Sequence, residues 1–432
     1  MYRQNRVKKS LRFSFLEGVF SSGMVGFTSD YITPYALALK ATPPQIGFLT
    51  AIPFLASSLG QLKSADITER LRSRKKVINI FIFLHTLMLL PIMFIPYWFK
   101  AHPVTCLIIF MTLFTGFNTL TGPVYAALLS EYVPFKMRGR YFGWRGRMMS
   151  LITICCSLVA GFILQHFKGN VLKGFFILFS IAFILRLVSW HFLTLIYEPH
   201  YIIKKESVFS FLDFIKNIRR SNFVKFVLFV SGMQFCVNVA SPFFSVFMIR
   251  DLKFNYVTYT ILVTAVTAVQ ILTIKRWGLW GDRAGNVKIL RFTSLVIASL
   301  PLWWLISQNP VYLFFTQLLS GFAWAGFNLA AGNFIYDAVT PSKRIRCIGY
   351  FNVFVGLAVF LGGIIGGYLA QVLPKIFGYQ ILTLFLISSI LRFIMATLLS
   401  RRIKEVRSTE KIKTKDLVCG VLGIKPITYS IR

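Results

Sequence analysis

The sequence predicts an all-α membrane protein whose twelve transmembrane helices form two pseudo-symmetric six-helix halves. Hydrophobic residues make up 56% of the 432 residues and charged residues only 14%, about half the share found in a soluble domain. Apolar runs of about 20 residues recur along the whole chain, and each can cross a ~30 Å hydrocarbon layer. Short motifs of the first half also return, in the same order, in the second half.

The apolar runs define the spans in chain order. We place them at 13–39, 45–62, 77–99, 104–129, 141–166, 171–196, 222–249, 256–274, 288–306, 311–335, 347–373 and 378–400. The first run follows a basic stretch, as a signal peptide does, but it is too long and lacks a small-residue cleavage site, so we expect an uncleaved span. The resulting divisions are a tail at 1–12, a half at 13–196, a linker at 197–221, a half at 222–400 and a basic tail at 401–432.

Positive charge gathers on one side of this arrangement. The formal net charge of +34 would by itself suit a nucleic-acid partner, but 39 of the 48 Lys and Arg residues fall in the tails and in alternate connections. This asymmetry follows the positive-inside rule and predicts that both termini are cytoplasmic. We therefore expect a multi-pass protein of a cell (inner or plasma) membrane, a monomer that contacts anionic lipid and binds no nucleic acid.

An internal repeat aligns the two halves. Its matching segments are TSDYITPY (28–35) with CVNVASPF (236–243), GFNTLTG (116–122) with GFNLAAG (326–332), and ILR (184–186) with ILR (390–392). The first match aligns Asp30 with Asn238, and the second aligns Asn118 with Asn328. The chain is therefore two related six-span halves joined by the linker.

The linker has the pattern of a surface helix. Ser210 and Asp213 have capping-box spacing, and four apolar residues behind Ser210 share one face. This pattern predicts a helix lying on the inner membrane surface.

Two loop motifs carry a family resemblance. GLWGDRAGNVK (278–288), between spans 8 and 9, fits the signature G-x-x-x-D-R-x-G-x-x-[RK] through Gly278, Asp282, Arg283, Gly285 and Lys288. EYVPFKMRGRYFG (131–143) is similar to the acidic-x-x-P…R-G loop after span 4 of the same family. Over about residues 13–400 the chain resembles the major facilitator superfamily. The resemblance implies alternating access between two rocking halves, with the substrate site near the membrane midplane.

The motif residues are candidates for gating. We expect Asp282 and Arg283, with Glu69 and Arg70 opposite, to bridge to helix ends and to acidic and basic residues after spans 4 and 10. The full candidate set is Glu69, Arg70, Glu131, Arg138, Arg140, Gly278, Asp282, Arg283, Gly285, Asp337 and Arg346. The alternative is that these loop charges serve topology only.

Asp30 precedes a proline by one helical turn. Because Pro34 has no amide hydrogen, it leaves the carbonyl of Asp30 without its helical partner, and such a group must be satisfied by protein or by a wet cavity. The same relation joins Asn238 to Pro242. Asp30 is therefore either a coupling or substrate-contacting carboxylate, or a carboxylate structurally paired with a neighbouring helix.

Glu17 lies about one turn inside the cytoplasmic end of the first span. Arg145 and Arg147 lie at the same depth at the start of span 5. We expect an ion pair between Glu17 and these arginines, with a proton-relay role as the alternative.

Two arginines lie deep within spans, Arg186 in span 6 and Arg392 in span 12. An arginine at this depth must face protein or water, and its five donors suit an amide or a freed carbonyl. We predict that each arginine bonds the GFN segment of its own half, through Asn118 and Asn328. The alternative is an anionic-substrate clamp in which both arginines face one cavity.

The leading functional hypothesis is a secondary transporter of a small solute, and not an enzyme. Coupling to a proton or cation would run through Asp30, with Asn238, Gln234, Asn118, Asn328 and Gln270 as further site candidates. No phosphate-binding loop, paired carboxylates or metal-ligand spacing is present in the sequence, so no cofactor and no metal is predicted. The alternatives are a lipid flippase-like protein and a non-transporting sensor on a transporter scaffold.

Overall fold

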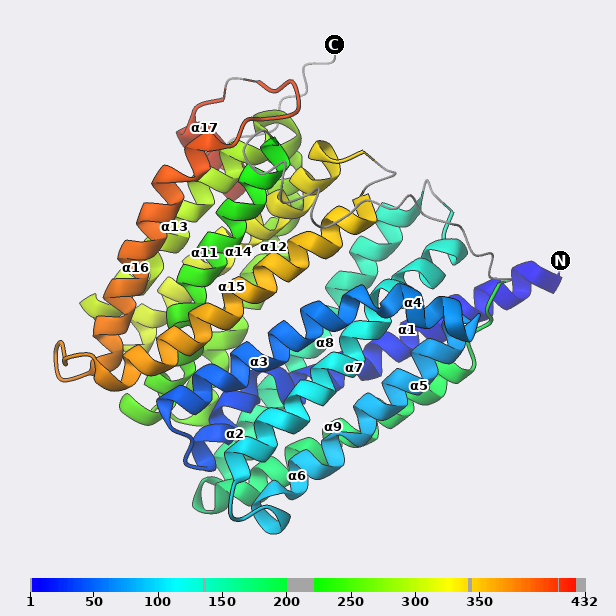
Figure 1. Ribbon diagram of the computed structural model, residues 1–432, viewed down its shortest axis with the longest axis horizontal. Coiled ribbons are helices and arrows are strands. Elements are labelled where there is room, and N and C mark those ends of the chain that lie inside the picture. The colour runs from blue at the N-terminus through cyan, green and yellow to red at the C-terminus, as the bar shows by residue number, and fades with distance from the viewer. Residues whose placement is uncertain (1, 135–136, 200–220, 341–343, 411, 425–432) are drawn as a thin grey trace. The chain divides into compact units, whose positions relative to one another are not determined.

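The computed structural model describes residues 2–134, 137–199, 221–340, 344–410 and 412–424, which form helices and no strand. Figure 1 labels these helices along the chain. The first-half elements are α1 (Tyr2–Thr28), the 3-10 turn η1 (Ser29–Tyr31), α2 (Ile32–Ala38), α3 (Pro43–Leu62), α4 (Ser64–Leu71), α5 (Arg74–Leu87), α6 (Leu89–Trp98), α7 (Pro103–Tyr132), α8 (Arg138–His166), η3 (Lys168–Asn170) and α9 (Val171–Thr194).

The second half has fewer and longer elements. They are α11 (Asn222–Val246), the π-helical turn η4 (Phe247–Asp251), α12 (Tyr256–Ala284), α13 (Asn286–Ile306), α14 (Pro310–Ala338), α15 (Arg344–Val372), α16 (Gln380–Leu398), η5 (Ser400–Arg402) and α17 (Thr414–Leu422). The predicted linker helix falls on residues 200–220, outside the described residues.

The chain divides into two compact units that do not follow the halves strictly. Unit 1 comprises Met1–Lys205, Pro242–Ile261 and Gly363–Gln371, and unit 2 comprises Glu206–Ser241, Leu262–Gly362 and Val372–Arg432. Unit 1 therefore holds the whole first half together with three helix ends from the second half, those of α11, α12 and α15.

Eleven helical segments within the described residues are long and apolar enough to cross a membrane. The first predicted span, 13–39, is not among them. The turn η1 ends α1 at Thr28, and the first turns of α1 consist of the charged N-terminal tail, so the apolar part of this helix is short. The break lies in the turn before Pro34, a residue that removes one helical hydrogen bond and crowds the preceding turn.

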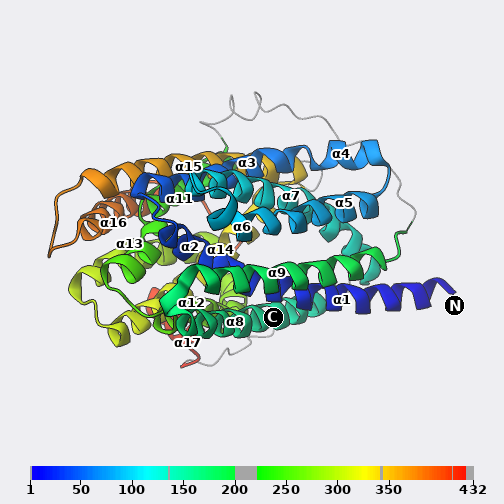
Figure 2. The ribbon, with the colours of Figure 1, turned by 90° about the horizontal axis from the view of Figure 1, so that it is seen from below.

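Within unit 1, α1 packs along both α8 and α9, and α7 packs on α3 and α5. Figure 2 shows α9 and α8 running alongside α1. Leu128, Leu129 and Val77 belong to a buried cluster between α5 and α7. These contacts set five helices around one space, which is described below.

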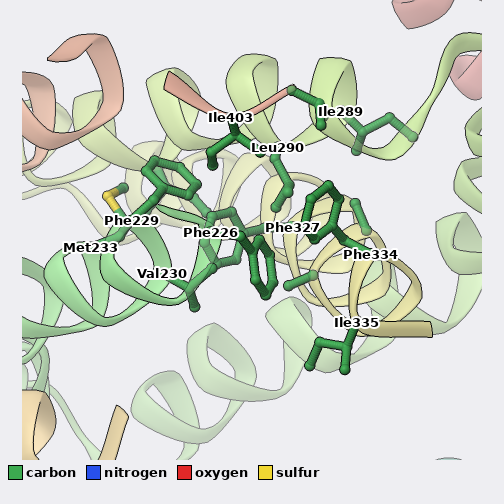
Figure 3. Packing of buried hydrophobic residues seen from close by; sticks show 14 of the residues in the cluster. Phe226, Phe229, Val230, Met233, Ile289, Leu290, Phe327, Phe334, Ile335 and Ile403 are labelled. Atoms are coloured by element: carbon green, nitrogen blue, oxygen red, sulfur yellow. The ribbon is translucent and has the colours of Figure 1, made fainter. Parts of the chain in front are cut away.

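Within unit 2, α13 packs against α14 and α16. Figure 3 shows the core that forms there: Phe226 and Phe229 of α11 face Phe327 and Phe334 of α14. The rings of Phe226 and Phe334 stack with centroids 4.5 Å apart. Dispersion between such closely packed aromatic rings stabilises helix association where hydrophobic burial from water does not operate.

The motif GLWGDRAGNVK does not form the loop that its sequence predicted. Helix α12 continues to Ala284, so Asp282 and Arg283 lie in its last turn. Gly285, with φ +87°, is the sole residue between α12 and α13. The span prediction ended at 274 because it followed hydropathy, whereas the helix extends beyond its apolar part.

Candidate functional site

A polar cavity of about 320 Å³ lies among helices α1, α5, α7, α8 and α9 of unit 1. We call it the first-half cavity. It is lined by Glu17, Gly18, Ser21, Ser22, Ile78, Ile82, Asn118, Thr121, Gly122, Tyr125, Arg145, Met149, Arg186 and Leu193. Three charged side chains, those of Glu17, Arg145 and Arg186, therefore share one space inside otherwise apolar helices.

Glu17 is the acidic member of the cavity and is 5% exposed. Its Oε2 lies 3.2 Å from Nη2 of Arg145 and accepts a hydrogen bond of 2.6 Å from the hydroxyl of Tyr125. Its Oε1 lies 3.7 Å from Nη1 of Arg186. The predicted ion pair with Arg145 is thus present, whereas Arg147 is exposed on α8 and does not line the cavity.

Arg145 reaches Glu17 across a glycine. A Cβ at Gly18 would lie 2.6 Å from Nη2 of Arg145, so the missing side chain leaves room for the guanidinium. Nη2 also donates to the carbonyl of Ser14 at 3.0 Å. Nε of Arg145 is buried and has no hydrogen-bond partner among the described residues. The cavity therefore contains a guanidinium with donor capacity left over.

Arg186 is held more completely and is 2% exposed. Nη2 donates to Oδ1 of Asn118 at 3.2 Å, which confirms the predicted bond to the GFN segment in the first half. Nη1 donates to Ser21 at 2.7 Å, and Nε donates to Nδ1 of His85 at 3.2 Å. His85 must then be neutral and carry its proton on Nε2, a tautomer inferred from this bond.

The corresponding prediction for the second half is wrong. Arg392 donates to the carbonyl oxygens of Ile297 and Val237, each at 3.2 Å, and Asn328 is exposed on α14. Pro301 explains the difference. It lies four residues after Ile297 in α13 and frees that carbonyl from the helix, which provides a buried acceptor within reach of Arg392. Each arginine thus bonds residues of its own half.

Asp30 lies in η1, where its two polar groups have different partners. Its Oδ2 accepts from the hydroxyl of Ser157 in α8 at 2.9 Å, and its backbone carbonyl accepts from the hydroxyl of Tyr259 in α12 at 2.6 Å. Next to it, the hydroxyls of Tyr31 and Thr260 lie 2.7 Å apart. We call these five residues the η1 contact. It satisfies the carbonyl that Pro34 frees and joins residues from both sequence halves.

The aligned position in the second half behaves differently. Helix α11 runs through Pro242 without a break to Val246. Nδ2 of Asn238 donates to the carbonyl of Gln234 at 2.8 Å, within the same helix. Gln270 is half-buried on α12. The structure places none of these three candidates in the first-half cavity.

The second-half motif residues gather around the C-terminal tail. Arg407 bonds Asp282 at 3.2 Å and Asp337 at 2.5 Å. Asn286 donates to Oδ2 of Asp337 at 2.7 Å. Glu405 caps the start of α13 by accepting from the amide of Val287 at 2.8 Å. The side chain of Arg346 lies outside the described residues.

The first-half motif residues have other partners than predicted. Glu131 forms a two-pronged ion pair with Arg74, at 2.6 and 3.0 Å. Arg138 donates to the carbonyls of Ser130 and Val133, so it caps the end of α7. Glu69, Arg70 and Arg140 are exposed. The predicted bridge to Glu131 is therefore made by Arg74, whose position just before span 3 gave no motif match.

Several contacts of the candidate site and of the motif residues had little or no sequence signal. Tyr125 lies seven residues after Asn118, on the same face of α7, and that spacing could have identified it. Ser157, Tyr259, Thr260, Arg74 and Arg407 belong to no repeated motif. Their roles depend on which helices pack together.

Comparison with known proteins gives consistent matches. The sequence profile described as Major Facilitator Superfamily matches residues 16–244 and 226–428. The chain is 27% identical over 196 residues to an uncharacterized transporter of Buchnera aphidicola subsp. Schizaphis graminum, covering 43% of this chain and 45% of the relative. It is 29% identical over 117 residues to the class B tetracycline resistance protein of Escherichia coli, covering 27% and 29%. These matches span less than half of either relative.

Solved structures share the fold over nearly the full length. The nucleoside transporter NupG superposes with a TM-score of 0.69 at 16% identity, covering 93% of this chain and 99% of that one. The D-xylose-proton symporter superposes with a TM-score of 0.71 at 13% identity, covering 94% and 99%. At these identities the likeness concerns the fold.

Proposed function

Because the chain belongs to the Major Facilitator Superfamily, we propose that it is a secondary active transporter that moves a small solute by alternating access between its two halves. Multi-pass helices with the superfamily fold support this reading. In such transporters the solute site is built from polar groups that face inward from membrane-spanning helices. We propose the first-half cavity as part of that site.

The observation that carries the proposal is the concentration of charge in this cavity. Glu17, Arg145 and Arg186 line one space of about 320 Å³. Ionisable side chains inside a membrane are rare and mark substrate or ion pathways. The volume is at the lower end of the ~300–1,000 Å³ range of small-molecule pockets, which favours a small solute.

The proposed topology has twelve spans and cytoplasmic termini. Eleven spans are long and apolar enough within the described residues, and the divided segment formed by α1, η1 and α2 would be the twelfth. The basic tails and alternate connections support the orientation. The tail residue Cys419 should react with a membrane-impermeant maleimide only after the cytoplasmic side is opened to the reagent; labelling of intact cells would contradict the orientation.

With this orientation, the η1 contact lies toward the outer side. It would have to break whenever the solute site opens outward, because it joins residues of the two halves. We further propose that coupling to a proton or cation runs through Asp30. Its carboxylate and its carbonyl belong to one residue, so a change in charge at Oδ2 would act directly on the η1 contact.

The test of the transporter proposal is flux in proteoliposomes that contain the purified protein. Uptake of a panel of labelled sugars, nucleosides, amino acids and organic acids is measured with and without an imposed proton gradient. We expect saturable uptake of at least one class, which the gradient accelerates if transport is coupled. Absence of protein-dependent flux for every class would reject the proposal.

A second candidate, an amphiphile transporter, is favoured by one observation. An apolar cavity of about 590 Å³ lies between α3 and α7, lined by Gln45, Phe48, Ile52, Thr105, Ile108, Ile109, Thr112 and Leu113. Such a surface would suit an acyl chain. Movement of a fluorescent phospholipid between leaflets of the same proteoliposomes distinguishes this candidate, and Ile109→Trp should then block the movement.

A further inference from the structure

The first-half cavity has an imbalance of charge that its own residues do not remove. Its lining holds two guanidinium groups, those of Arg145 and Arg186, and one carboxylate, that of Glu17. With Glu17 ionised, positive charge exceeds negative charge by one. An uncompensated charge is costly inside a membrane protein, so the cavity favours an anion as occupant.

Hydrogen-bond capacity in the cavity points the same way. Nε of Arg145 is buried without a partner among the described residues. Asn118 is exposed, and its Nδ2 has no hydrogen-bond partner among the described residues, while its Oδ1 accepts from Arg186. Both are donors, and carboxylate oxygens accept from such donors at short range.

The two arginines differ in how they are held. Arg186 bonds His85, Ser21, Ser189 and Asn118, so it is a fixed part of the wall. Among the described residues Arg145 has two hydrogen-bond partners, Glu17 and the carbonyl of Ser14, and its guanidinium lies over the ring of Tyr125 at 6.0 Å. An entering anion could therefore exchange with Glu17 at Arg145 while Arg186 stays in place.

We propose that the solute of the first-half cavity is a small organic monoanion whose carboxylate binds Arg145, in competition with Glu17. This inference rests on the proposed transport function and adds its substrate class. The sequence suggested, as an alternative, an anion clamp between Arg186 and Arg392. The arginine that lines the first-half cavity together with Arg186 is instead Arg145.

The test measures ligand binding to the purified protein in nanodiscs through the shift of its thermal unfolding midpoint. The probes are lactate and benzoate, their uncharged amides lactamide and benzamide, and inorganic phosphate. A ligand that binds only the folded state raises the midpoint in a saturable way. We expect at least one carboxylate to do so and its amide not to. A response to phosphate alone would instead identify a phosphate site and overturn the carboxylate assignment.

Three variants make the assignment specific. Arg145→Gln should weaken carboxylate binding about 10- to 100-fold, the loss expected for a charge-assisted hydrogen bond. The carboxylate affinity of Arg145→Lys should lie between those of wild type and Arg145→Gln, since lysine keeps the positive charge but lacks the planar guanidinium. Glu17→Gln should bind the carboxylate more tightly, because it removes the competing carboxylate; a purely structural Glu17 would not produce this gain. Arg147→Gln, two residues along α8 and outside the cavity, is the matched control.

The outcomes separate this inference from the transport proposal. Equal binding of acid and amide, or unchanged binding in Arg145→Gln, overturns the anion assignment even if proteoliposomes transport an uncharged solute. Specific carboxylate binding without flux of any solute keeps the anion site and rejects transport. No response to any anion of the panel also overturns the assignment.

Discussion

Three prolines, Pro34, Pro96 and Pro301, each leave the carbonyl four residues earlier without its helical partner. A side chain of another helix donates a hydrogen bond to each of these carbonyls. Tyr259 donates to the carbonyl of Asp30 at 2.6 Å, Tyr35 to that of Ile92 at 2.8 Å and Arg392 to that of Ile297 at 3.2 Å. An unpaired carbonyl is expensive where water is scarce. Each pair therefore fixes the position of one helix against another.

Tyr259→Phe should destabilise the protein by about 1–3 kcal/mol, because it removes the donor to the Asp30 carbonyl and the hydrogen bond with the Ser245 hydroxyl. The ring and its packing remain. Thermal or denaturant unfolding of the purified protein measures the loss. Tyr256→Phe is the control, since that hydroxyl bonds no described residue. Equal stability of Tyr259→Phe and wild type would show that the carbonyl is satisfied by another group.

Arg392 and Pro301 should be energetically coupled. Arg392→Met alone removes the donor to the Ile297 carbonyl and should cost about 3–5 kcal/mol, as for other broken buried polar networks. In a Pro301→Ala background the amide at position 301 can bond that carbonyl, so the same substitution should cost about 1–2 kcal/mol less. A double-mutant cycle of unfolding free energies measures this coupling. Additive losses would mean that the proline is not the source of the acceptor.

At the residue scale, the sequence could identify a group that requires a hydrogen-bond partner, but not the residue that provides it. Pro34 predicted a freed carbonyl at Asp30, because the rule concerns residues four apart. Tyr259, which satisfies it, lies 229 residues away, and no local rule reaches that far. The prediction for Arg186 succeeded because Asn118 is polar within an apolar span. The prediction for Arg392 failed because its acceptors are backbone carbonyls, which every residue has.

At the scale of elements, the C-terminal tail is bound to the end of α12 and the start of α13. Arg276 donates to the carbonyl of Leu422 at 2.9 Å, and Arg291 donates to that of Ile403, also at 2.9 Å. The hydrogen bond to Asp337 is the main cause that raises the pKa of Arg407 above its usual value. The tail thus occupies the acidic motif residues that the sequence assigned to a gate.

Arg407→Gln should loosen the tail and leave the helical bundle intact. Its side chain is 40% exposed, so the loss in global stability should stay within about 1 kcal/mol. Amide hydrogen exchange across α17 should rise several-fold, because one of the contacts that hold the tail is gone. Arg402→Gln, exposed and five residues earlier, is the control. Unchanged exchange in α17 would show that packing alone holds the tail.

The spans were predicted well at the scale of elements, and the connections poorly. Apolar periodicity and length locate a membrane helix, but a span predicted from them ends at the first polar residues, even where the helix continues. Helix α12 passes this limit by ten residues, from 274 to Ala284. Sequence hydropathy also missed the turn η1, because its three residues Ser29, Asp30 and Tyr31 are too few to end an apolar run of this length.

At the scale of the whole molecule, the repeat predicted two related halves, and the halves differ where function is expected. Glu17, Arg145 and Arg186 form a charged cavity in the first half. In the second half the hydrogen-bond partners of Arg392 among the described residues are one hydroxyl and two carbonyls. Alignment of the halves identifies residues that they share, such as Arg186 and Arg392, whereas the partners of these two arginines differ between the halves.

Asp30→Asn tests coupling in the assembled transporter. The protein should fold, because the side-chain oxygen of an asparagine can still accept the hydrogen bond from Ser157. Gradient-driven uptake in proteoliposomes should fall at least tenfold, while exchange of internal for external solute persists. Ser157→Ala, which removes the hydrogen bond to Oδ2 but keeps the carboxylate, is the comparison and should retain coupling. Full gradient-driven transport by Asp30→Asn would make Asp30 a structural residue.

The distance in sequence between Asp30 and Tyr259 has a consequence for biosynthesis. A ribosome adds about 5–20 residues each second, so roughly 10–45 s pass between the synthesis of Asp30 and that of its partner. Until α12 is synthesised the hydroxyl of Tyr259 is absent, so the Asp30 carbonyl needs another donor, such as water. A chain that stops before Tyr259 lacks this hydrogen bond, so the first half alone keeps an acceptor that the finished protein satisfies from its second half.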